Sequence, residues 1–164
     1  MARVAVSIGS NLEREHNVKD ALAALGKTFG ELLRSPVYES AAYGFDGPPF
    51  YNLVVVFETP LDVRAVRAKI QAIENLQGRK KGENRSGSRS LDLDLLLYDD
   101  AAFRDQGLDG PRREIFEHAY ILKPLADLLP AAPHPVTGES FADIWLRLGS
   151  RQEALSVVDG LDLT

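Results

Sequence analysis

The sequence predicts an α+β fold with a ferredoxin-like βαββαβ core, in which helices pack against an antiparallel sheet. Segments with the alternation of strands and segments with apolar residues at helical spacing follow one another in that order. The 164 residues include 45% hydrophobic and 26% charged residues, ordinary globular values that argue against disorder. We find no internal repeat, low-complexity tract or Pro/Gly-rich linker, and therefore expect residues 1–164 to form one domain.

The first half of the core is predicted from alternation and spacing. Residues 3–8 alternate larger apolar residues with smaller ones, which predicts a strand. Apolar residues at helical spacing predict a helix over about 14–28, and Asn11 before it is a candidate helix cap. Residues 32–40 and 51–58 are expected to form two further strands. The strand over 51–58 is rich in β-branched residues, so we expect it to lie at the centre of the sheet.

The connection between these two strands is a predicted loop over residues 41–50, which contains Gly44, Gly47, Pro48 and Pro49. Hairpin loops usually have about two to five residues. A loop that exceeds what its connection requires is often functional, so this loop is a candidate for ligand binding.

The second half supplies a helix, a strand and a last short helix. Residues 59–62 predict a helix start with Thr59 as the N-cap. Residues 91–98 predict a strand with its odd-numbered leucines on one face and Asp92, Asp94, Leu96 and Tyr98 on the other. The helix that begins after residue 62, the second of the chain, has an apolar stripe of Val63, Val66, Ile70 and Ile73. A last amphipathic helix is expected from Phe141, Ile144, Trp145 and Leu148.

Composition and charge exclude several classes of protein. The absence of cysteine excludes disulfides, thiolate metal sites and cysteine nucleophiles. No apolar run approaches the roughly 20 residues that span a bilayer, and the N-terminus lacks the pattern of a signal peptide. We therefore expect a cytoplasmic protein without membrane contact. The net charge of −5 argues against a nucleic-acid partner, because such binding depends on a basic surface.

The charge is unevenly distributed along the chain. Residues 79–89 carry a local charge of +4, which leaves −9 for the remainder. A compact basic loop on an acidic protein suggests a small polyanion as the partner. The cations of this loop are Arg79, Lys80, Lys81, Arg85 and Arg89.

Asp92 and Asp94 follow the basic loop directly. Residues two apart on a strand point to the same face with Cα atoms about 6.6 Å apart, so two carboxylates there can bracket hard divalent cations. Mg²⁺ suits such a pair because it takes oxygen ligands, keeps several waters and completes its coordination with phosphate oxygens. Taken alone, the two aspartates could also be a solvated polar face of a strand. The same Asp-x-Asp motif also occurs in other transferases.

The juxtaposition of loop and carboxylates indicates phosphoryl transfer. In that chemistry, fixed cations and metal ions neutralise the charge that is spread over the phosphate oxygens. Arginine binds phosphate through two parallel hydrogen bonds, and lysine acts as a mobile point charge.

The run Arg85-x-Gly87-Ser88-Arg89-x-x-Asp92-Leu93-Asp94-Leu95-Leu96 resembles the signature of the 6-hydroxymethyl-7,8-dihydropterin pyrophosphokinase family of the folate pathway. The resemblance covers about residues 3–130. Five further segments match family motifs in the expected order: Gly9-Ser10-Asn11-Leu12, Tyr38-Glu39-Ser40, Phe50-Tyr51-Asn52, Glu74-x-x-Gln77-Gly78-Arg79 and Leu122-Lys123-Pro124-Leu125.

The resemblance implies a monomeric, ATP-dependent enzyme that transfers pyrophosphate to the pterin's hydroxymethyl group and releases AMP. It implies two Mg²⁺ ions held by Asp92 and Asp94, and assigns Arg79 and Arg89 as catalytic residues that clamp the phosphates. ATP binding is implied for Gln71, Glu74, Lys81, Arg85, Arg89 and Arg112. Pterin binding is implied for Ser40, Ala41, Tyr43, Gly44, Phe50, Asn52, Asp92 and Tyr120, with Phe50 and Tyr120 on the two faces of the ring.

Some positions depart from the family's usual pattern. Ser86 replaces a frequent aromatic residue, Ser88 a proline, Arg112 a histidine and His118 an arginine. Histidine does not carry the permanent positive charge of arginine, so we assign His118 no phosphate contact. Two alternatives remain open from the sequence. One is another Mg²⁺-dependent nucleotide transferase with a different acceptor, and the other is a ferredoxin-like nucleotide-binding module without chemistry.

Overall fold

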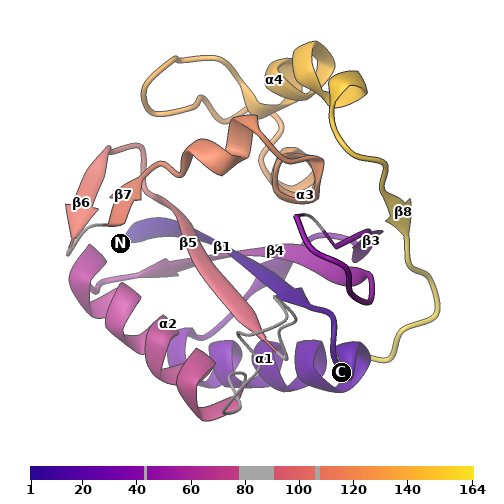
Figure 1. Ribbon diagram of the computed structural model, residues 1–164. Helices are drawn as coiled ribbons and strands as arrows, with labels where there is room; N and C mark the ends of the chain where they lie inside the picture. The colour runs from indigo at the N-terminus through magenta and orange to yellow at the C-terminus, as the bar shows by residue number, and fades with distance from the viewer. Residues whose placement is uncertain (43, 78–90, 106–107) are drawn as a thin grey trace.

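The computed structural model describes residues 1–42, 44–77, 91–105 and 108–164. An antiparallel sheet forms the centre of the molecule, with helices on both faces (Figure 1). Its elements are, in order, β1 (Ala2–Ser10), α1 (Arg14–Phe29), β2 (Leu33–Arg34), β3 (Tyr38–Ser40), β4 (Phe50–Thr59), α2 (Val63–Gln77), β5 (Asp92–Tyr98), β6 (Phe103–Asp105), β7 (Leu108–Gly110), the 3₁₀ turn η2 (Arg113–Phe116), α3 (Ala119–Leu128), α4 (Phe141–Leu148), the 3₁₀ turn η3 (Gly149–Arg151) and β8 (Ser156–Val157).

The strand order of the main sheet is β5-β1-β4-β3-β8, and β2 pairs with β4. All of these pairs are antiparallel. The predicted βαββαβ core, with β4 near the middle of the sheet, is confirmed. None of the helices in the described part of the chain is long and apolar enough to cross a lipid bilayer.

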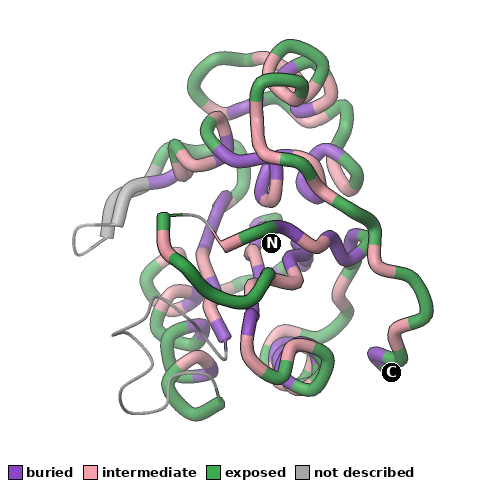
Figure 2. Tube along the Cα trace, turned by 45° about the vertical axis from the view of Figure 1, so that its right-hand side comes forward, coloured by how far each residue is buried: buried purple, intermediate pink, exposed green. Residues whose placement is uncertain are grey.

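Two hydrophobic cores lie on the two faces of the sheet. Val4, Val6 and Ile8 of β1 point to the face covered by α1 and α2, as their alternation predicts. Ala5 and Val54 point to the other face, where α3 and α4 pack. Buried residues accordingly follow the strands in Figure 2, whereas the outer sides of the helices are exposed. The candidate site described below lies on the α3 face.

The predicted strand over residues 32–40 is wrong in one respect, because it is interrupted. Residues 35–37 separate β2 from β3, and Pro36 has no N–H group to donate to a neighbouring strand. Ser35 keeps the pairing with β4 instead: its hydroxyl accepts from the Val54 N–H at 3.0 Å, and its own N–H donates to the Val54 carbonyl at 3.0 Å. The segment between β2 and β3 therefore stays hydrogen-bonded to β4.

Two predicted helix caps are also wrong. Thr59 is the last residue of β4, and the first turn of α2 is capped by Asp62, whose Oδ1 accepts from the Ala65 N–H at 2.8 Å. Asn11 does not cap α1; its Nδ2 donates to the carbonyl of Pro48 at 3.1 Å. Asn11 therefore ties the end of β1 to the 41–50 loop.

The Asp62 cap gives a stability prediction. We expect Asp62→Ala to lower the free energy of unfolding by about 1 kcal/mol, because an N–H of the first turn loses its acceptor. The melting temperature should fall by about 2–4 °C, measured by circular dichroism. Asp62→Asn keeps an oxygen acceptor and serves as the control. Equal melting temperatures for the alanine variant and the wild type would contradict the assignment.

The predicted alternation in β5 holds only for its first half. Leu91, Leu93 and Leu95 belong to the α1/α2 core, but both Leu96 and Leu97 pack in the α3/α4 core. The pairing with β1 shifts by one residue between Ala5 and Val6, so the strand contains a β-bulge here. Asp92 and Asp94 precede the bulge and keep the α3-side orientation that alternation predicts.

Candidate active site

A cavity of about 220 Å³ lies on the α3 side of the sheet. We call it the sheet cavity. It is lined from the strands by Ser7, Ile8, Gly9, Ser40, Phe50, Asn52, Asp92 and Asp94, from the 41–50 loop by Ala41 and Phe45, and from η2 and α3 by Glu114, Tyr120 and Ile121.

The floor of the sheet cavity is a row of residues across three strands. Gly9 of β1 pairs with Asp92 of β5 on one side and with Asn52 of β4 on the other, and Ser7 pairs with Asp94. A Cβ atom at Gly9 would lie 3.6 Å from Asn52 Oδ1 and 3.8 Å from the Phe50 ring, within the cavity. Gly9 therefore leaves room above the sheet between Asp92 and Asn52 for a flat ligand.

The wall beside β3 is polar and closely hydrogen-bonded. The Asn52 side chain is only 5% exposed, and its Nδ2 donates to Ser40 Oγ at 2.8 Å and to the Tyr38 carbonyl at 3.4 Å. These bonds fix the amide in one orientation, with its Oδ1 on the side of Gly9. Asn52 thus presents a defined hydrogen-bonding group at the cavity floor.

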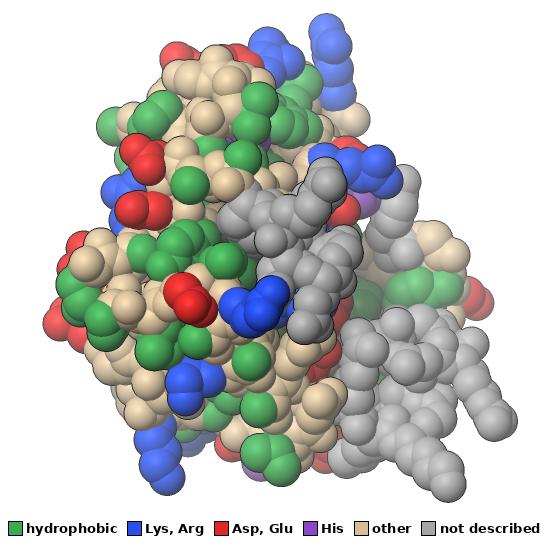
Figure 3. Space-filling model, turned by 90° about the vertical axis from the view of Figure 1, so that its left-hand side faces the viewer, with side chains coloured by type: hydrophobic (Ala, Val, Ile, Leu, Met, Phe, Trp, Pro, Cys, Tyr) green, Lys and Arg blue, Asp and Glu red, His purple; other side chains and the backbone are tan. Residues whose placement is uncertain are grey.

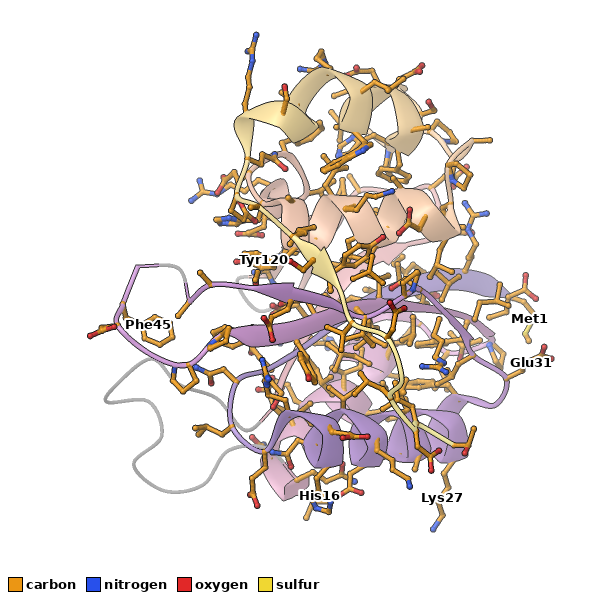
Figure 4. The ribbon with its side chains drawn as sticks, turned by 90° about the vertical axis from the view of Figure 1, so that its right-hand side faces the viewer. Met1, His16, Lys27, Glu31, Phe45 and Tyr120 are labelled. Carbon is orange, nitrogen blue, oxygen red and sulfur yellow. The ribbon has the colours of Figure 1, made fainter. Side chains whose placement is uncertain are left out.

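Aromatic side chains enclose the remaining sides. Phe50, at the start of β4, meets Phe45 of the loop edge-to-face with ring centroids 6.2 Å apart. Tyr120 comes from α3, and in Figure 4 it lies above the sheet end from which the loop with Phe45 extends. Burial, followed by the charge of Glu153, raises the pKa of the Tyr120 hydroxyl, so it remains a neutral hydrogen-bonding group.

Asp92 and Asp94 line a second cavity as well. This edge cavity, of about 130 Å³, lies beside the outer edge of β5. Glu74 of α2 accepts a hydrogen bond from the Leu93 N–H at 2.7 Å, which holds the helix against the strand between the two aspartates. The edge cavity is lined by Arg67, Ile70, Gln71, Glu74, Asp92, Leu93, Asp94, Leu95 and Arg112.

Charge is concentrated where the two cavities meet. Burial, and then the neighbouring Asp92 carboxylate, raises the pKa of Asp94 to about 7, although Arg112 acts in the opposite direction. Arg112 Nη1 lies 3.5 Å from Asp94 Oδ1, and its Nε donates to Glu114 Oε2 at 2.8 Å. Burial alone would lower the pKa of Arg112, but the hydrogen bond to Glu114 and the nearby aspartates raise it.

The donor set fits a hard divalent cation that brings further ligands with it. Among the described residues, no group of three or more His, Cys, Asp or Glu side chains is arranged to hold a metal ion by itself. Asp92 and Asp94 nevertheless offer two oxygen donors on one strand face, at a place where like charge is unfavourable without a cation. Mg²⁺ is bound in this way when waters and phosphates complete its coordination.

The structure brings together many of the residues that the sequence singles out. Ser40, Ala41, Phe50, Asn52, Asp92 and Tyr120 line the sheet cavity, and Gln71, Glu74 and Arg112 line the edge cavity with Asp92 and Asp94. Gly44 does not line either cavity; it has a φ of +81°, which glycine adopts without strain. Tyr43, Arg79, Lys81, Arg85 and Arg89, like Ser86 and Ser88, lie outside the described residues.

The predicted basic loop, residues 79–89, also lies outside the described part of the chain. Figure 3 shows a face on which Lys and Arg side chains lie among Asp and Glu side chains. The described residues on the face shown in Figure 3 therefore carry charges of both signs.

Sequence reasoning missed several cavity residues. That Ser7 and Gly9 line the cavity can be predicted from alternation only once the pairing of β1 with β5 is known. Glu114 was not singled out, although it stands two residues after Arg112, the residue with which it pairs. Phe45 lies in the loop considered a candidate for ligand binding, but no motif marks it.

A family model, curated relatives and solved structures all show similarity to proteins of the same kind. The model of the family described as 7,8-dihydro-6-hydroxymethylpterin-pyrophosphokinase (HPPK) matches residues 5–130. The 2-amino-4-hydroxy-6-hydroxymethyldihydropteridine pyrophosphokinase of Aquifex aeolicus is 33% identical over 139 residues, which are 83% of this chain and 86% of that protein. The folic acid synthesis protein fol1 of Pneumocystis carinii is 34% identical over 148 residues, 88% of this chain.

This chain spans only 20% of the length of the Pneumocystis protein. Among solved structures, HPPK-DHPS of Plasmodium falciparum, a triple mutant with STZ-DHP, superposes with a TM-score of 0.73 over 92% of this chain and 44% of that one. At 16% identity, that likeness concerns the fold.

Proposed function

Because this chain belongs to the 7,8-dihydro-6-hydroxymethylpterin-pyrophosphokinase family, we propose that it transfers the terminal pyrophosphate of ATP to the hydroxymethyl group of 6-hydroxymethyl-7,8-dihydropterin. The observation that supports this proposal most directly is that Asp92 and Asp94 line two cavities at once. One cavity has aromatic and amide walls suited to a heterocycle. The other adjoins α2 and Arg112 and is suited to a nucleotide phosphate.

The pterin ring would lie in the sheet cavity. Phe50 and Tyr120 line it and would stack on the two faces of the ring, which contributes about 0.5–1.5 kcal/mol beyond burial. The absence of a side chain at Gly9 leaves space for the ring, and Asn52 would hydrogen-bond its edge. Backbone and side-chain groups of residues 40–44 would contact the rest of that edge, Ser40, Ala41, Tyr43 and Gly44 among them.

ATP would lie along the edge cavity, with Gln71, Glu74 and Arg112 lining the nucleotide site. The family signature adds Lys81 and Arg85 as phosphate ligands. It adds Arg79 and Arg89 as the catalytic arginines that stabilise charge on the transferring group. In the reaction, the pterin hydroxyl oxygen forms a bond to the β-phosphorus and loses its proton. The bond between that phosphorus and the oxygen bridging to the α-phosphate breaks, and AMP leaves with the electron pair.

Asp92 and Asp94 would hold Mg²⁺, two ions in this proposal, together with phosphate oxygens. When bound, such ions neutralise phosphate charge and orient the attacking and leaving oxygens. Arg112 would keep Glu114 and Asp94 in place through its contacts with them, at 2.8 Å and 3.5 Å respectively.

The test of this function is AMP release from ATP, measured by chromatography with each component omitted in turn. We expect AMP only when both Mg²⁺ and 6-hydroxymethyl-7,8-dihydropterin are present. AMP release that does not depend on the pterin would indicate a transferase with another acceptor. ATP binding without AMP release would indicate a binding module. Either result would overturn the proposal.

The stacking role of Phe50 gives a separate prediction. We expect Phe50→Ala to raise the KM for the pterin about tenfold, because the ring loses one aromatic face. The KM for ATP should stay within about twofold of the wild-type value, since Phe50 does not line the edge cavity. Phe50→Tyr keeps the aromatic face and is the control. An equal increase in both KM values would mean that Phe50 acts through the fold.

We infer further that residues 1–164 act as one domain. The C-terminal residues return to the sheet, where β8 pairs with β3, and Leu163 is buried in the α1/α2 core. Separation of these residues from the core would expose apolar surface of both partners.

A further inference from the structure

The C-terminal strap, residues 149–164, lies beyond the region matched by the family model. In Figure 1 it leaves α4, passes the edge of the sheet as β8 and ends beside α1. It makes two contacts near the sheet cavity, one to the Tyr120 backbone and one to β3, the strand that ends at Ser40. Because the pterin would need both its stacking face and its hydrogen-bonding edge held in place, these contacts bear on function.

The first contact is to the wall that carries Tyr120. Glu153 Oε1 accepts a hydrogen bond from the Tyr120 N–H at 3.1 Å, and Glu153 Oε2 lies 3.7 Å from Nδ1 of His118. Tyr120 is in the first turn of α3, where backbone N–H groups have no acceptor within the helix. The N-cap residue His118 provides no side-chain cap, so Glu153 supplies one from the strap.

His118 also contacts the Tyr120 ring. The two rings are stacked, with centroids 4.7 Å apart and planes 20° from parallel. His118 is buried and does not line the sheet cavity, whereas Tyr120 does. His118 therefore covers one face of the Tyr120 ring from behind, and Glu153 contacts both residues. Beside them, Gln152 Nε2 donates to the Phe116 carbonyl at 2.8 Å and anchors the strap to η2.

The second contact is to β3, whose last residue, Ser40, lines the sheet cavity. In β8, Val157 pairs with Tyr38 and Ser156 with Glu39, and the Val158 N–H donates to the Val37 carbonyl at 2.9 Å. The next residue of β3 is Ser40, which accepts the hydrogen bond from Asn52. The strap thus covers the outer edge of the strand that orients Asn52.

We propose that Glu153 is a positioning residue for the pterin: it sets Tyr120 and His118 from the strap, so that the Tyr120 ring lies at the correct height over the cavity floor. This inference rests on the proposed function. It assigns His118, where the family pattern has an arginine, a role behind the stacking ring. Glu153 itself touches no substrate.

The test compares Glu153→Ala with Glu153→Gln in the 164-residue chain, with Glu139→Ala as the matched control. Glu139 likewise contacts a neighbouring side chain, Arg147 at 2.6 Å, but it does not line the sheet cavity. The readouts are the KM for the pterin at saturating ATP, the KM for ATP at saturating pterin, and hydrogen exchange of the Tyr120 amide.

We expect Glu153→Ala to raise the pterin KM about tenfold and to leave the ATP KM within about twofold of wild type. The Tyr120 amide should exchange faster in this variant. Glu153→Gln should restore both values to within about threefold, because its amide oxygen still accepts from Tyr120 N–H. Glu139→Ala should change none of them.

An unchanged pterin KM in Glu153→Ala, or equal losses for pterin and ATP, would overturn the positioning role. Failure of Glu153→Gln to restore the pterin KM would do the same. These results differ from failure of the proposed function itself, in which the wild-type chain would release no AMP with the pterin.

Discussion

Asp94→Asn is expected to reduce pterin-dependent AMP release by about a thousandfold, which corresponds to about 4 kcal/mol of transition-state stabilisation. Asp94 lines both cavities, so its carboxylate stands between the two proposed substrates. Asparagine has nearly the same shape but carries no charge, so it cannot replace the carboxylate as a ligand for Mg²⁺. The measurement is kcat at saturating ATP, pterin and Mg²⁺.

The Asp94 variant should still fold. The pKa of Asp94 is raised from 3.8 to about 7, so ionisation of this group favours the unfolded chain and removes stability as the pH rises through this interval. Removing the charge should therefore keep or raise the melting temperature at pH 8 without metal. Asp20→Asn, at a half-buried position on α1 that lines neither cavity, is the control. Near-normal turnover in a folded Asp94→Asn variant would contradict the assignment.

Asn52→Ala is expected to lower kcat/KM for the pterin about a hundredfold, or about 2.7 kcal/mol. The substitution removes the donor to Ser40 and Tyr38 as well as the group that would bind the pterin edge. A site built to hydrogen-bond its substrate loses specificity strongly when one of its buried polar groups is missing. The measurement is the dependence of initial rate on pterin concentration.

A second buried asparagine separates this effect from general destabilisation. Asn17→Ala removes the hydrogen bond from Nδ2 to the Leu12 carbonyl, at 2.7 Å, but Asn17 does not line the sheet cavity. We expect Asn17→Ala to lower the melting temperature with little change in the pterin KM. If both variants lost pterin affinity equally, Asn52 would have only a structural role.

The sequence predicted the core elements well because their signals are local. The alternation of Val4, Val6 and Ile8 and the helical stripe of Val66, Ile70 and Ile73 report directly which side chains are buried. The pair Asp92 and Asp94 could be placed on one face for the same reason. These predictions need only the periods of strand and helix.

The features that the sequence did not predict depend on contacts between distant segments. The bulge at Leu96 and Leu97 could not be predicted, because it lies in a run of leucines and an apolar side chain suits either face of the sheet. The Glu153 contact with Tyr120 joins residues 33 apart in the chain, with no periodic pattern between them. The role of Gly9 in the cavity floor follows only from its pairing with Asp92 and Asn52.

The most direct test of the account is the identity of the products. ³¹P NMR of a complete reaction with ATP, Mg²⁺ and 6-hydroxymethyl-7,8-dihydropterin resolves AMP, ADP, free pyrophosphate and the pterin diphosphate ester. The account predicts AMP and the pterin diphosphate in equal amounts. Formation of ADP with a pterin monophosphate, or of AMP with free pyrophosphate, would contradict it.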